Sequence, residues 1–534
     1  ITAISQFTTT IFDTATDETI VPYAPGAVIA PDWSDQADPG VTITYTHVLT
    51  NTGNYTETFD LTTHSEFGYA EVSPATGVEW GQGAGYTGVQ VVVWIPTHAA
   101  AGETEQTEVI VMFAGQQEVA VDSTTVNSIN GTRYVAPNGT DENNNCTDLK
   151  YNPCATVQHA VDYAVTGDEV RVAQGVYTDV HTTGGYTQVV YLEKSLTLRG
   201  GYIITDWDSS DPVACSTVLD AGGQGRVVYV AGGITPTIEG FHLWRGNVNG
   251  NGAGLYIAAG AVPTVRLNLI YSNTASGAES KGGGVYYEGG GSPLLERNIV
   301  YGNAAEDGGG FYIASGSPAV WNNVVYRNAA DDLGGGLYSG GSPTVWNNTF
   351  YSNTANSGGG IYVASGSPVV SDTIVAENAQ YGIYNAGGSP ALAYNLVWVN
   401  SPANFYNVIP GSETITTTPR FVDAASGDLH LWGDSPAINA GDPNATRPVD
   451  DRDGNPRPLL GCYDVGAYEY GLVSAKTVTP AIALPDEPIT YTVILANTGS
   501  AAVESVRITD TLHTYLGHAD LLTYTAGSGE YVTT

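Results

Sequence analysis

Residues 308–328 read GGGFYIASGSPAVWNNVVYRN, and this stretch decides the fold because the chain repeats it. Close copies follow as GGGLYSGGSPTVWNNTFYSN (334–353) and GGGIYVASGSPVVSDTIVAEN (358–378). The proline of the motif stands at Pro263, Pro293, Pro318, Pro343, Pro368 and Pro390, and its closing asparagine at Asn273, Asn303, Asn328, Asn353, Asn378 and Asn400. Both series advance in steps of 30, 25, 25, 25 and 22 residues. A period in the twenties with short apolar segments and glycine-rich turns predicts a β-solenoid.

Equal positions in successive coils should stack, because neighbouring strands of a parallel sheet lie about 4.8 Å apart. Besides the closing asparagines, a second ladder is expected at Asn268, Asn298, Asn323, Asn348 and Asn395, with Thr373 as the exception, and a tyrosine column at Tyr256, Tyr286, Tyr312, Tyr338, Tyr362 and Tyr384. Asparagine tolerates the left-handed backbone of a tight corner, so we place the ladder residues there. Glycine triplets such as Gly308–Gly310 are expected to supply positive φ at another bend. We interpret all these columns as structural.

Four segments are expected along the chain: an extended segment (1–25), an Ig-like β-sandwich (26–128), the solenoid with an N-terminal capping helix over 156–164 (129–470), and a second Ig-like domain (471–534). The motif YTHVLTNTG (45–53) returns as YTVILANTG (491–499) at an offset of 446, which relates the two ends. After the shared NTG turn, the second copy has only 35 residues (500–534), so we expect that domain to be incomplete.

Three motifs resemble a known family: YVAPNGTD (134–141), the GGGxY repeats, and the closing GDLHLWGDSPAINAGD (427–442) with DVGAYEY (464–470). They are similar to the choice-of-anchor, pectate-lyase-like β-helix domains of bacterial exported proteins. The YTxxxxNTG motif resembles Ig-like repeats of bacterial surface proteins. The predicted fold class is therefore all-β, a right-handed parallel β-helix flanked by Ig-like β-sandwiches, with six clear coils over about 247–400. The resemblance also implies a location outside the cell.

The charge balance limits the partners that the chain can have. Seventeen Lys and Arg residues stand against 54 Asp and Glu residues, a formal net charge of −37. This charge argues against nucleic acid as a partner, because its phosphates would be repelled. The sequence has no apolar run long enough to span a bilayer, so no direct membrane insertion is expected. The chain begins at Ile1 without Met, which is typical of a processed chain or a fragment.

Two kinds of covalent modification are indicated by the sequence. Cys146 and Cys154, eight residues apart in an Asn-rich loop, are the expected disulfide, whereas the pairing of Cys215 and Cys462 stays open. Sequons for N-glycosylation stand at Asn54, Asn130, Asn138, Asn145, Asn347 and Asn444. Asn347 is also open to a purely structural interpretation because it lies in a coil.

Catalytic chemistry is not indicated. β-Helix lyases use an Asp cluster that holds Ca²⁺ together with a basic residue, and hydrolases need paired carboxylates. The repeats carry Thr, Val, Asn and Tyr instead, and His242 with Arg245 is interpreted as a coil edge, so we predict no catalytic residue and no organic cofactor. Ca²⁺ is the one candidate ligand, at Asp450, Asp451 and Asp453 or at Glu306 and Asp332, with solvated loops as the alternative.

We therefore predict a non-enzymatic extracellular structural protein, a rigid β-helix rod for surface display, adhesion or head-to-tail filament assembly. The alternative is a β-helix protein that binds or degrades polysaccharide. The expected partners are other copies of the chain, other surface proteins, or glycans. Residues 1–25 carry the self-assembly candidates Ile4, Phe7, Ile11 and Phe12, on a strand that would complete the C-terminal domain of the next copy. A fragment of a longer domain array is the open alternative.

Overall fold

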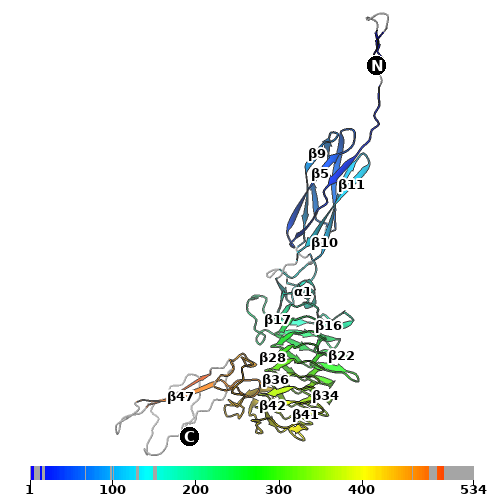
Figure 1. Ribbon diagram of the computed structural model, residues 1–534. Coiled ribbons are helices and arrows are strands. Elements are labelled where there is room, and N and C mark those ends of the chain that lie inside the picture. The colour runs from blue at the N-terminus through cyan, green and yellow to red at the C-terminus, as the bar shows by residue number, and fades with distance from the viewer. Residues whose placement is uncertain are drawn as a thin grey trace, which may run out of the picture.

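The computed structural model describes residues 2–4, 12–14, 18–66, 68–96, 99, 102–127, 131–147, 153–459, 461–479 and 490–497, and only the backbone of 2–4, 12–14, 472–479 and 490–497. Figure 1 shows a narrow β-sandwich at one end of a broader stack of coils. Nearly all regular structure is strand, so the predicted all-β fold class is confirmed. Of the residues described, none belongs to a helix with the length and apolar character that membrane crossing requires.

Two sheets form the N-terminal sandwich. One contains, in spatial order, β3 (Ala27–Ala30), β5 (Thr42–Asn51), β9 (Gly85–Trp94) and β7 (Ala70–Ser73). The other contains β4 (Ser34–Ala37), β11 (Gln116–Val126), β10 (Thr104–Phe113), β6 (Glu57–Ser65) and β8 (Val78–Trp80), with only β4 and β11 running parallel. Buried and exposed residues alternate along β10, because one face of each strand packs on the core that Leu49, Phe59 and Val91 share.

Three long sheets line the solenoid. The first contains β12 (Thr132–Val135), β13 (Glu169–Ala173), β17 (Thr197–Tyr202), β20 (Thr237–Glu239), β24 (Thr264–Arg266), β28 (Leu294–Glu296), β32 (Ala319–Trp321), β36 (Thr344–Trp346), β39 (Val369–Ser371) and β42 (Ala391–Ala393). The second contains β14 (Gly175–Tyr177), β18 (Thr217–Asp220), β21 (Phe241–Trp244), β25 (Leu269–Tyr271), β29 (Ile299–Tyr301), β33 (Val324–Tyr326), β37 (Thr349–Tyr351), β40 (Ile374–Ala376) and β43 (Leu396–Trp398). Their strands run parallel throughout, as stacked coils require.

The third sheet contains β15 (His181–Thr183), β16 (Tyr186–Leu192), β19 (Arg226–Val230), β23 (Leu255–Ile257), β27 (Val285–Tyr287), β31 (Phe311–Ile313), β35 (Leu337–Ser339), β38 (Ile361–Val363), β41 (Ile383–Asn385) and β44 (Phe405–Tyr406). A shorter sheet, here called the lip, contains β22 (Asn247–Asn249), β26 (Thr274–Ser276), β30 (Ala304–Asp307) and β34 (Ala329–Leu333). A regular coil contributes one strand to each of the three long sheets, and four coils add a strand to the lip. Side chains such as Val320, Val325 and Phe311 meet in a single buried core.

Both predicted asparagine ladders are present and fully buried. Asn323 donates from its backbone nitrogen to Oδ1 of Asn348 at 2.9 Å and from Nδ2 to the carbonyl of Leu295 at 2.8 Å. The same bonds recur at the closing asparagines, where Asn328 donates to Oδ1 of Asn353 at 3.0 Å. Each amide therefore binds the coils on both sides of it, and the ladders hold the coils in register.

The left-handed residue at these corners stands one position before the ladder, so our placement of that geometry on the ladder asparagines was wrong by one residue. Positive φ values of 46 to 57° occur at Leu267, Ser272, Arg297, Asn322, Arg327, Asn347, Ser352, Asp372, Glu377, Tyr394 and Val399. Each precedes a ladder position directly. The ladder side chain must turn inward to reach the neighbouring coils, and the residue before it therefore makes the bend.

The glycine triplets serve two purposes, of which positive φ is only the first. Gly308 and Gly334 open their triplets with φ of 66 and 70°. The second glycine is required for close approach instead, because a Cβ on Gly309 would overlap the backbone of Ala329. The expectation of positive φ therefore holds for the first residue of a triplet and not for all three.

Helix α1 (Val157–Tyr163) lies at the N-terminal end of the coils, where a capping helix was predicted over 156–164. Thr156 is its N-cap and accepts a hydrogen bond from the His159 backbone. Val157, Ala160 and Val161 are buried against the first coils. The helix thereby covers strand edges and core that would otherwise meet solvent.

Residues 421–470, here called the wrap, return along the outside of the second sheet. They include β45 (Phe421–Asp423) and β46 (Asp428–Leu431). Leu429, Val465 and Tyr468 pack there against Val324 and Ile374 of the coils. Val325 and Val375, which directly follow these two residues, face the inner core instead, so both members of each pair are buried.

The two chain ends carry short pairs of strands. β1 (Thr2–Ile4) and β2 (Phe12–Thr14) are antiparallel, with Ile4 opposite Phe12. β47 (Leu472–Thr479) and β48 (Thr490–Asn497) are also antiparallel. Phe7 and Ile11, the other two self-assembly candidates, lie outside the described residues.

Candidate functional surfaces

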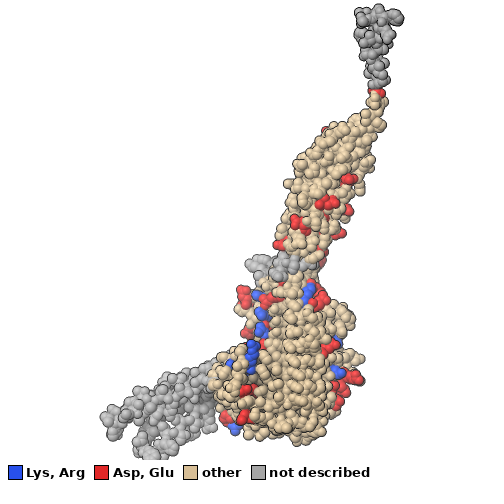
Figure 2. Space-filling model, in the orientation of Figure 1, with Lys and Arg blue, Asp and Glu red and all other residues tan. Residues whose placement is uncertain are grey.

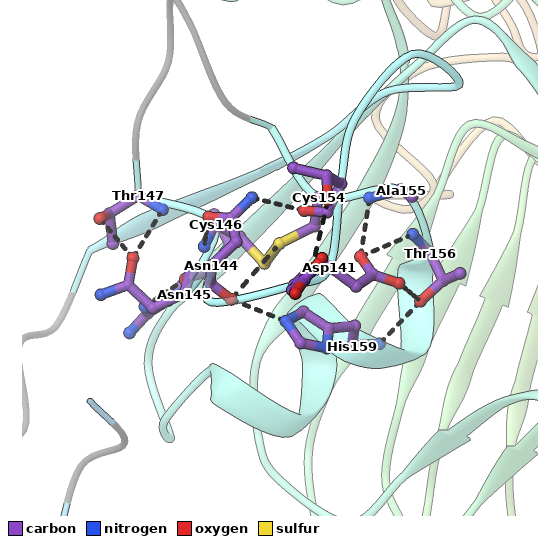
Figure 3. Close-up of a disulfide and its surroundings, with 12 residues drawn as sticks. Asp141, Asn144, Asn145, Cys146, Thr147, Cys154, Ala155, Thr156 and His159 are labelled. Carbon is purple, nitrogen blue, oxygen red and sulfur yellow. Dashed lines mark hydrogen bonds between the residues drawn. A yellow bond between two sulfur atoms is a disulfide. The ribbon is translucent and has the colours of Figure 1, made fainter. Parts of the chain in front are cut away.

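The capped end of the solenoid contains the disulfide. Cys146 and Cys154 are joined, with their Cα atoms 5.1 Å apart, beside α1 (Figure 3). Oδ1 of Asp141 accepts from the backbone of Ala155 at 2.8 Å, and Nε2 of His159 lies 2.7 Å from the carbonyl of Asn144. His159 and the two sulfurs are the one grouping of three potential metal ligands among the described residues. Because the sulfurs are bonded to each other, the arrangement holds the cap together rather than a metal.

The acidic turn at Asp450, Asp451 and Asp453 does not present three convergent carboxylates. Asp450 pairs with Arg297 at 2.8 Å. Asp451 is fully buried, and Oδ1 accepts from the backbone of Asp453 and Asn455 at 2.9 and 2.7 Å. These carboxylates therefore organise the wrap and anchor it to the coils. The carboxylate oxygens that would bind a Ca²⁺ ion already accept hydrogen bonds from the protein.

The second predicted Ca²⁺ candidate lies on the lip. Glu306 belongs to β30 and Asp332 to β34, and the register shifts between these strands. Ala305 pairs with Ala330 and Asp307 pairs with Leu333, so β34 has one residue more than β30 between these two pairs. Figure 2 shows acidic side chains gathered along this edge of the solenoid. Within the described chain, Glu306 and Asp332 belong to no group of three potential ligands.

The sequons differ in accessibility. Asn138 and Asn444 are exposed, whereas Asn347 is 1% exposed. Nδ2 of Asn54 donates to the carbonyl of Pro22 at 2.6 Å. Asn145 is buried beside the disulfide, and Asn130 lies outside the described residues. Of the five sites among the described residues, Asn138 and Asn444 are thus the exposed ones.

The pair His242 and Arg245 is separated by its environment. Arg245 forms an ion pair with the buried carboxylate of Asp220 in the preceding coil. Burial lowers the pKa of His242, whose ring lies edge-on to Tyr271. The two side chains therefore stabilise the coil edge separately.

A column of charged side chains on the first sheet went unnoticed in the sequence. Arg171, Arg199, Glu239, Arg266, Glu296, Trp321 and Trp346 share one register. Glu239 pairs with Arg199 at 3.4 Å and with Arg266 at 2.9 Å. The column ends on the parallel rings of Trp321 and Trp346, 5.5 Å apart. Irregular coil lengths hid this column, because Arg199 and Glu239 are 40 residues apart and Glu239 and Arg266 only 27.

Comparisons with known proteins bear on the solenoid. A family model described as a right-handed β-helix region matches residues 227–397. The solenoid is a right-handed β-helix. The predicted handedness and fold of this domain are thereby confirmed. No curated protein matches the chain.

Three solved structures show weak likeness to parts of this chain. A PapD-like domain of human CEP192 is 13% identical over 21% of this chain and 96% of its own, with a TM-score of 0.15. A family 123 glycoside hydrolase from Clostridium perfringens is 12% identical over 21% of this chain and 30% of its own, with a TM-score of 0.15. A FixG-related protein from Vibrio parahaemolyticus is 9% identical over 20% of this chain and 98% of its own, with a TM-score of 0.16. At TM-scores this low, nothing about the function of this chain follows from the likeness.

The wrap of the β-helix buries a cluster of ionisable groups. Arg457 is almost fully buried and donates from Nη1 to Glu469 at 2.6 Å. Asp464 accepts from the backbone of Asn439 at 2.7 Å. Burial raises the pKa of Asp464 to about 7 and also raises the pKa of Glu469. The cluster is closed to solvent, so it stabilises the wrap and offers no place for a substrate.

His430 sits between two carboxylates at the edge of this cluster. Nε2 lies 2.8 Å from Asp453 and Nδ1 lies 2.5 Å from Asp428. The ring stacks on Tyr468 at 3.8 Å. Burial disfavours the charged imidazole, but the hydrogen bonds to Asp453 and Asp428 outweigh it, and the pKa of His430 is raised. Its partners are up to 23 residues away with no periodic spacing, so the sequence offered no signal for this site.

The third sheet of the β-helix carries the tyrosine column on its outer face. It is longer than predicted and contains Tyr191, Tyr229, Tyr256, Tyr286, Tyr312, Tyr338, Tyr362, Tyr384 and Tyr406 in one register. Neighbouring ring centroids are 4.2 to 5.5 Å apart throughout. Contacts of this kind stabilise adjacent coils beyond the area that they bury.

Proposed function

We propose that this chain is a non-catalytic structural protein that works outside the cell as a rigid rod for surface display, adhesion or filament assembly. The observation that supports this most is the continuous pair of asparagine ladders, in which a buried amide such as Asn328 binds both neighbouring coils. Interactions that repeat in each coil from Asn268 to Asn400 resist bending along that part of the stack. β-Helix regions occur in enzymes and in non-enzymes, so the proposal depends on these residues rather than on the fold.

We propose further that copies join head to tail through their ends. Residues 18–24 are exposed, and Ile20 and Val21 retain 81% and 56% exposure. Strand β48 matches β5 in sequence, and β5 has β3 on one side and β9 on the other. Among the described residues β48 pairs only with β47. A strand from the N-terminal segment of another copy would fit beside β48 in the position that β9 has beside β5.

Electron microscopy of the purified 534-residue chain tests this proposal. We expect filaments from the intact chain and single particles after deletion of residues 1–22. A double variant refines the test: Phe7→Asp with Ile11→Asp should abolish assembly, because it replaces two apolar candidates of the donor strand by charges. Filaments from the deleted chain would refute strand donation.

Polysaccharide binding or cleavage is the second candidate. It is favoured by the charged column of the first sheet, which ends on the stacked rings of Trp321 and Trp346. Purified protein would be incubated with pectins, alginates and other acidic glycans, with and without Ca²⁺. Release of unsaturated or reducing ends would establish an enzyme. Binding without cleavage that Trp346→Ala removes, and that Trp33→Ala on the sandwich leaves intact, would establish a glycan-binding rod.

A further inference from the structure

The tyrosine column is an unbroken stack of oxidisable rings that runs along the β-helix. The nine phenols belong to strands from β16 to β44, and no other side chain interrupts their register. The second sheet has a shorter stack, in which Tyr271, Tyr301 and Tyr326 follow one another at 5.0 and 5.1 Å. That stack ends under the wrap, where Tyr326 is buried. The shorter stack therefore ends on a buried ring at this side.

The tyrosine column ends on its most exposed ring. Tyr406, the last ring, is 42% exposed, whereas Tyr229, Tyr286 and Tyr312 are 6%, 8% and 7% exposed and the other five rings are only partly exposed. The ring of Tyr406 lies 4.2 Å from Tyr384 at an angle of 9°. It also contacts Tyr381 at 5.1 Å. The most exposed phenol of the column is thus in direct ring contact with a chain of phenols that are all less exposed than it is.

The phenols of the column can exchange a hydrogen atom with one another. Burial raises the pKa of Tyr256 and Tyr312, so these side chains keep their protons. The ring centroids of Tyr312 and Tyr338 are 4.2 Å apart, as are those of Tyr384 and Tyr406, so these neighbouring phenols are in direct contact. When one ring has become a phenoxyl radical, its neighbour can give up one electron and one proton to it. The first ring is then a phenol again and the neighbour is the radical, so no external base is consumed.

We propose that the tyrosine column passes oxidising equivalents to Tyr406 and makes Tyr406 a site of dityrosine cross-linking between copies of the chain. A one-electron oxidant, such as a peroxidase supplied with hydrogen peroxide, removes an electron from a ring of the column, and the phenolic proton is lost to solvent. The radical moves by exchange between neighbouring phenols until it reaches the exposed end.

Two such radicals on different copies then couple through the ring carbons ortho to their oxygens. One carbon–carbon bond forms, and each of these carbons loses its hydrogen as a proton while the ring regains its phenol hydroxyl from solvent. In total, two phenols yield one dityrosine, two protons and two electrons, and the oxidant takes the electrons. The coupling occurs at Tyr406 because this ring is the most exposed of the column and is therefore the one that a second rod reaches most easily.

Photo-oxidation of the full chain with tris(bipyridyl)ruthenium and persulfate, followed by mass spectrometry of dityrosine-containing peptides, tests the proposal. Tyr55 and Tyr69 are the internal controls, since they are 47% and 54% exposed and stand outside the column. We expect cross-links at Tyr406 to exceed those at either control several-fold. Equal or lower cross-linking at Tyr406 would overturn the proposal, because exposure alone would then explain the yield.

A second arm interrupts the column. Tyr362→Phe keeps a ring in place but cannot form a phenoxyl radical, so the yield at Tyr406 should fall several-fold. Tyr338→Phe interrupts the column one coil earlier. This variant is used instead of Tyr362→Phe if circular dichroism shows that the Tyr362→Phe protein is unfolded. Tyr326→Phe, in the stack under the wrap, is the matched control and should leave the yield unchanged. An unchanged yield in a folded Tyr362→Phe or Tyr338→Phe protein would show that the column carries no radical.

Discussion

The side chain of Asn347 donates a hydrogen bond to the backbone carbonyl of Asp464 at 3.0 Å, across 117 residues of sequence. The same corner position of the neighbouring coils also binds the wrap. Arg297 and Asn322 both reach Asp450, and Asp372 accepts from the backbone of Asp442 at 2.6 Å. At four successive left-handed corners, different side chains thus bind the wrap, each through the hydrogen bond that its partner group allows.

This contact predicts which sequons can carry a glycan. Expression of the chain in a secretory host with N-glycosylation should leave Asn347 unmodified, because its Nδ2 atom is buried and already donates to the wrap. Asn138 and Asn444 are exposed and should be occupied. Glycopeptide mass spectrometry measures each site. A glycan on Asn347 in folded protein would contradict the position of the wrap.

The asparagine ladders predict a graded loss of stability. Asn323→Ala removes the acceptor of the Asn298 backbone nitrogen, together with one hydrogen bond to Nδ2 of Asn298 and one to the carbonyl of Leu295. We expect a loss of about 3 kcal/mol in the free energy of unfolding. Asn323→Thr should lose less, since Thr373 occupies this position and its Oγ1 accepts from the Asn348 backbone at 3.3 Å. Urea denaturation compares the two variants, and equal losses would argue against the hydrogen bonds as the cause.

Close approach at the glycine triplets predicts a second contrast. Gly359→Ala places a Cβ over the carbonyl of Ala379 and should cost about 3 kcal/mol or more, because backbone must move. Gly302→Ala adds a Cβ with nothing within 4 Å, so only the left-handed φ of 60° is strained. Its expected cost is about 1–2 kcal/mol. Thermal unfolding of both variants measures the difference, and the reverse order would show that φ alone governs these glycines.

The wrap should be most stable in mild acid. The raised pKa of His430 gives stability that is complete below its usual value of 6.5 and is lost as pH rises through the folded pKa. The pKa of Asp464 is raised from 3.8 to about 7, so the stability of the wrap also falls as pH rises through that interval. We therefore expect hydrogen exchange in residues 421–470 to increase across this range beyond its intrinsic pH dependence. His430→Gln should flatten the change, and an equal response in that variant would exclude His430 as a source.

Spacing explains what the sequence could reveal. The ladders and the tyrosines recur at the coil period, and periodic stacking follows from strand separation alone, so Asn328 and Tyr312 could be placed correctly. The left-handed corner was misplaced because the pattern identifies which asparagines recur but not which neighbour bends. Tyr191, Tyr229 and Tyr406 were missed because their coils depart from the repeat in length and motif.

Contacts between distant segments have no periodic signal. Arg297 and Asp450 are 153 residues apart, and nothing in either motif indicates the other. The acidic turn at Asp451 has the composition of a Ca²⁺ loop, yet its carboxylate accepts from backbone groups of its own turn. Composition reveals which atoms are available, whereas only the packed chain reveals which partners reach them first.

The anchoring of the wrap also limits how the length of the rod can change. Its contacts occupy the coils from Arg297 to Asp372, so a coil gained or lost within that interval would move at least one corner away from its partner. A coil gained nearer to α1 would disturb none of them and would extend the β-helix by about 4.8 Å. The length of the β-helix can therefore change by coils added or lost near α1, whereas the number of coils held by the wrap, which leads to β47, stays fixed.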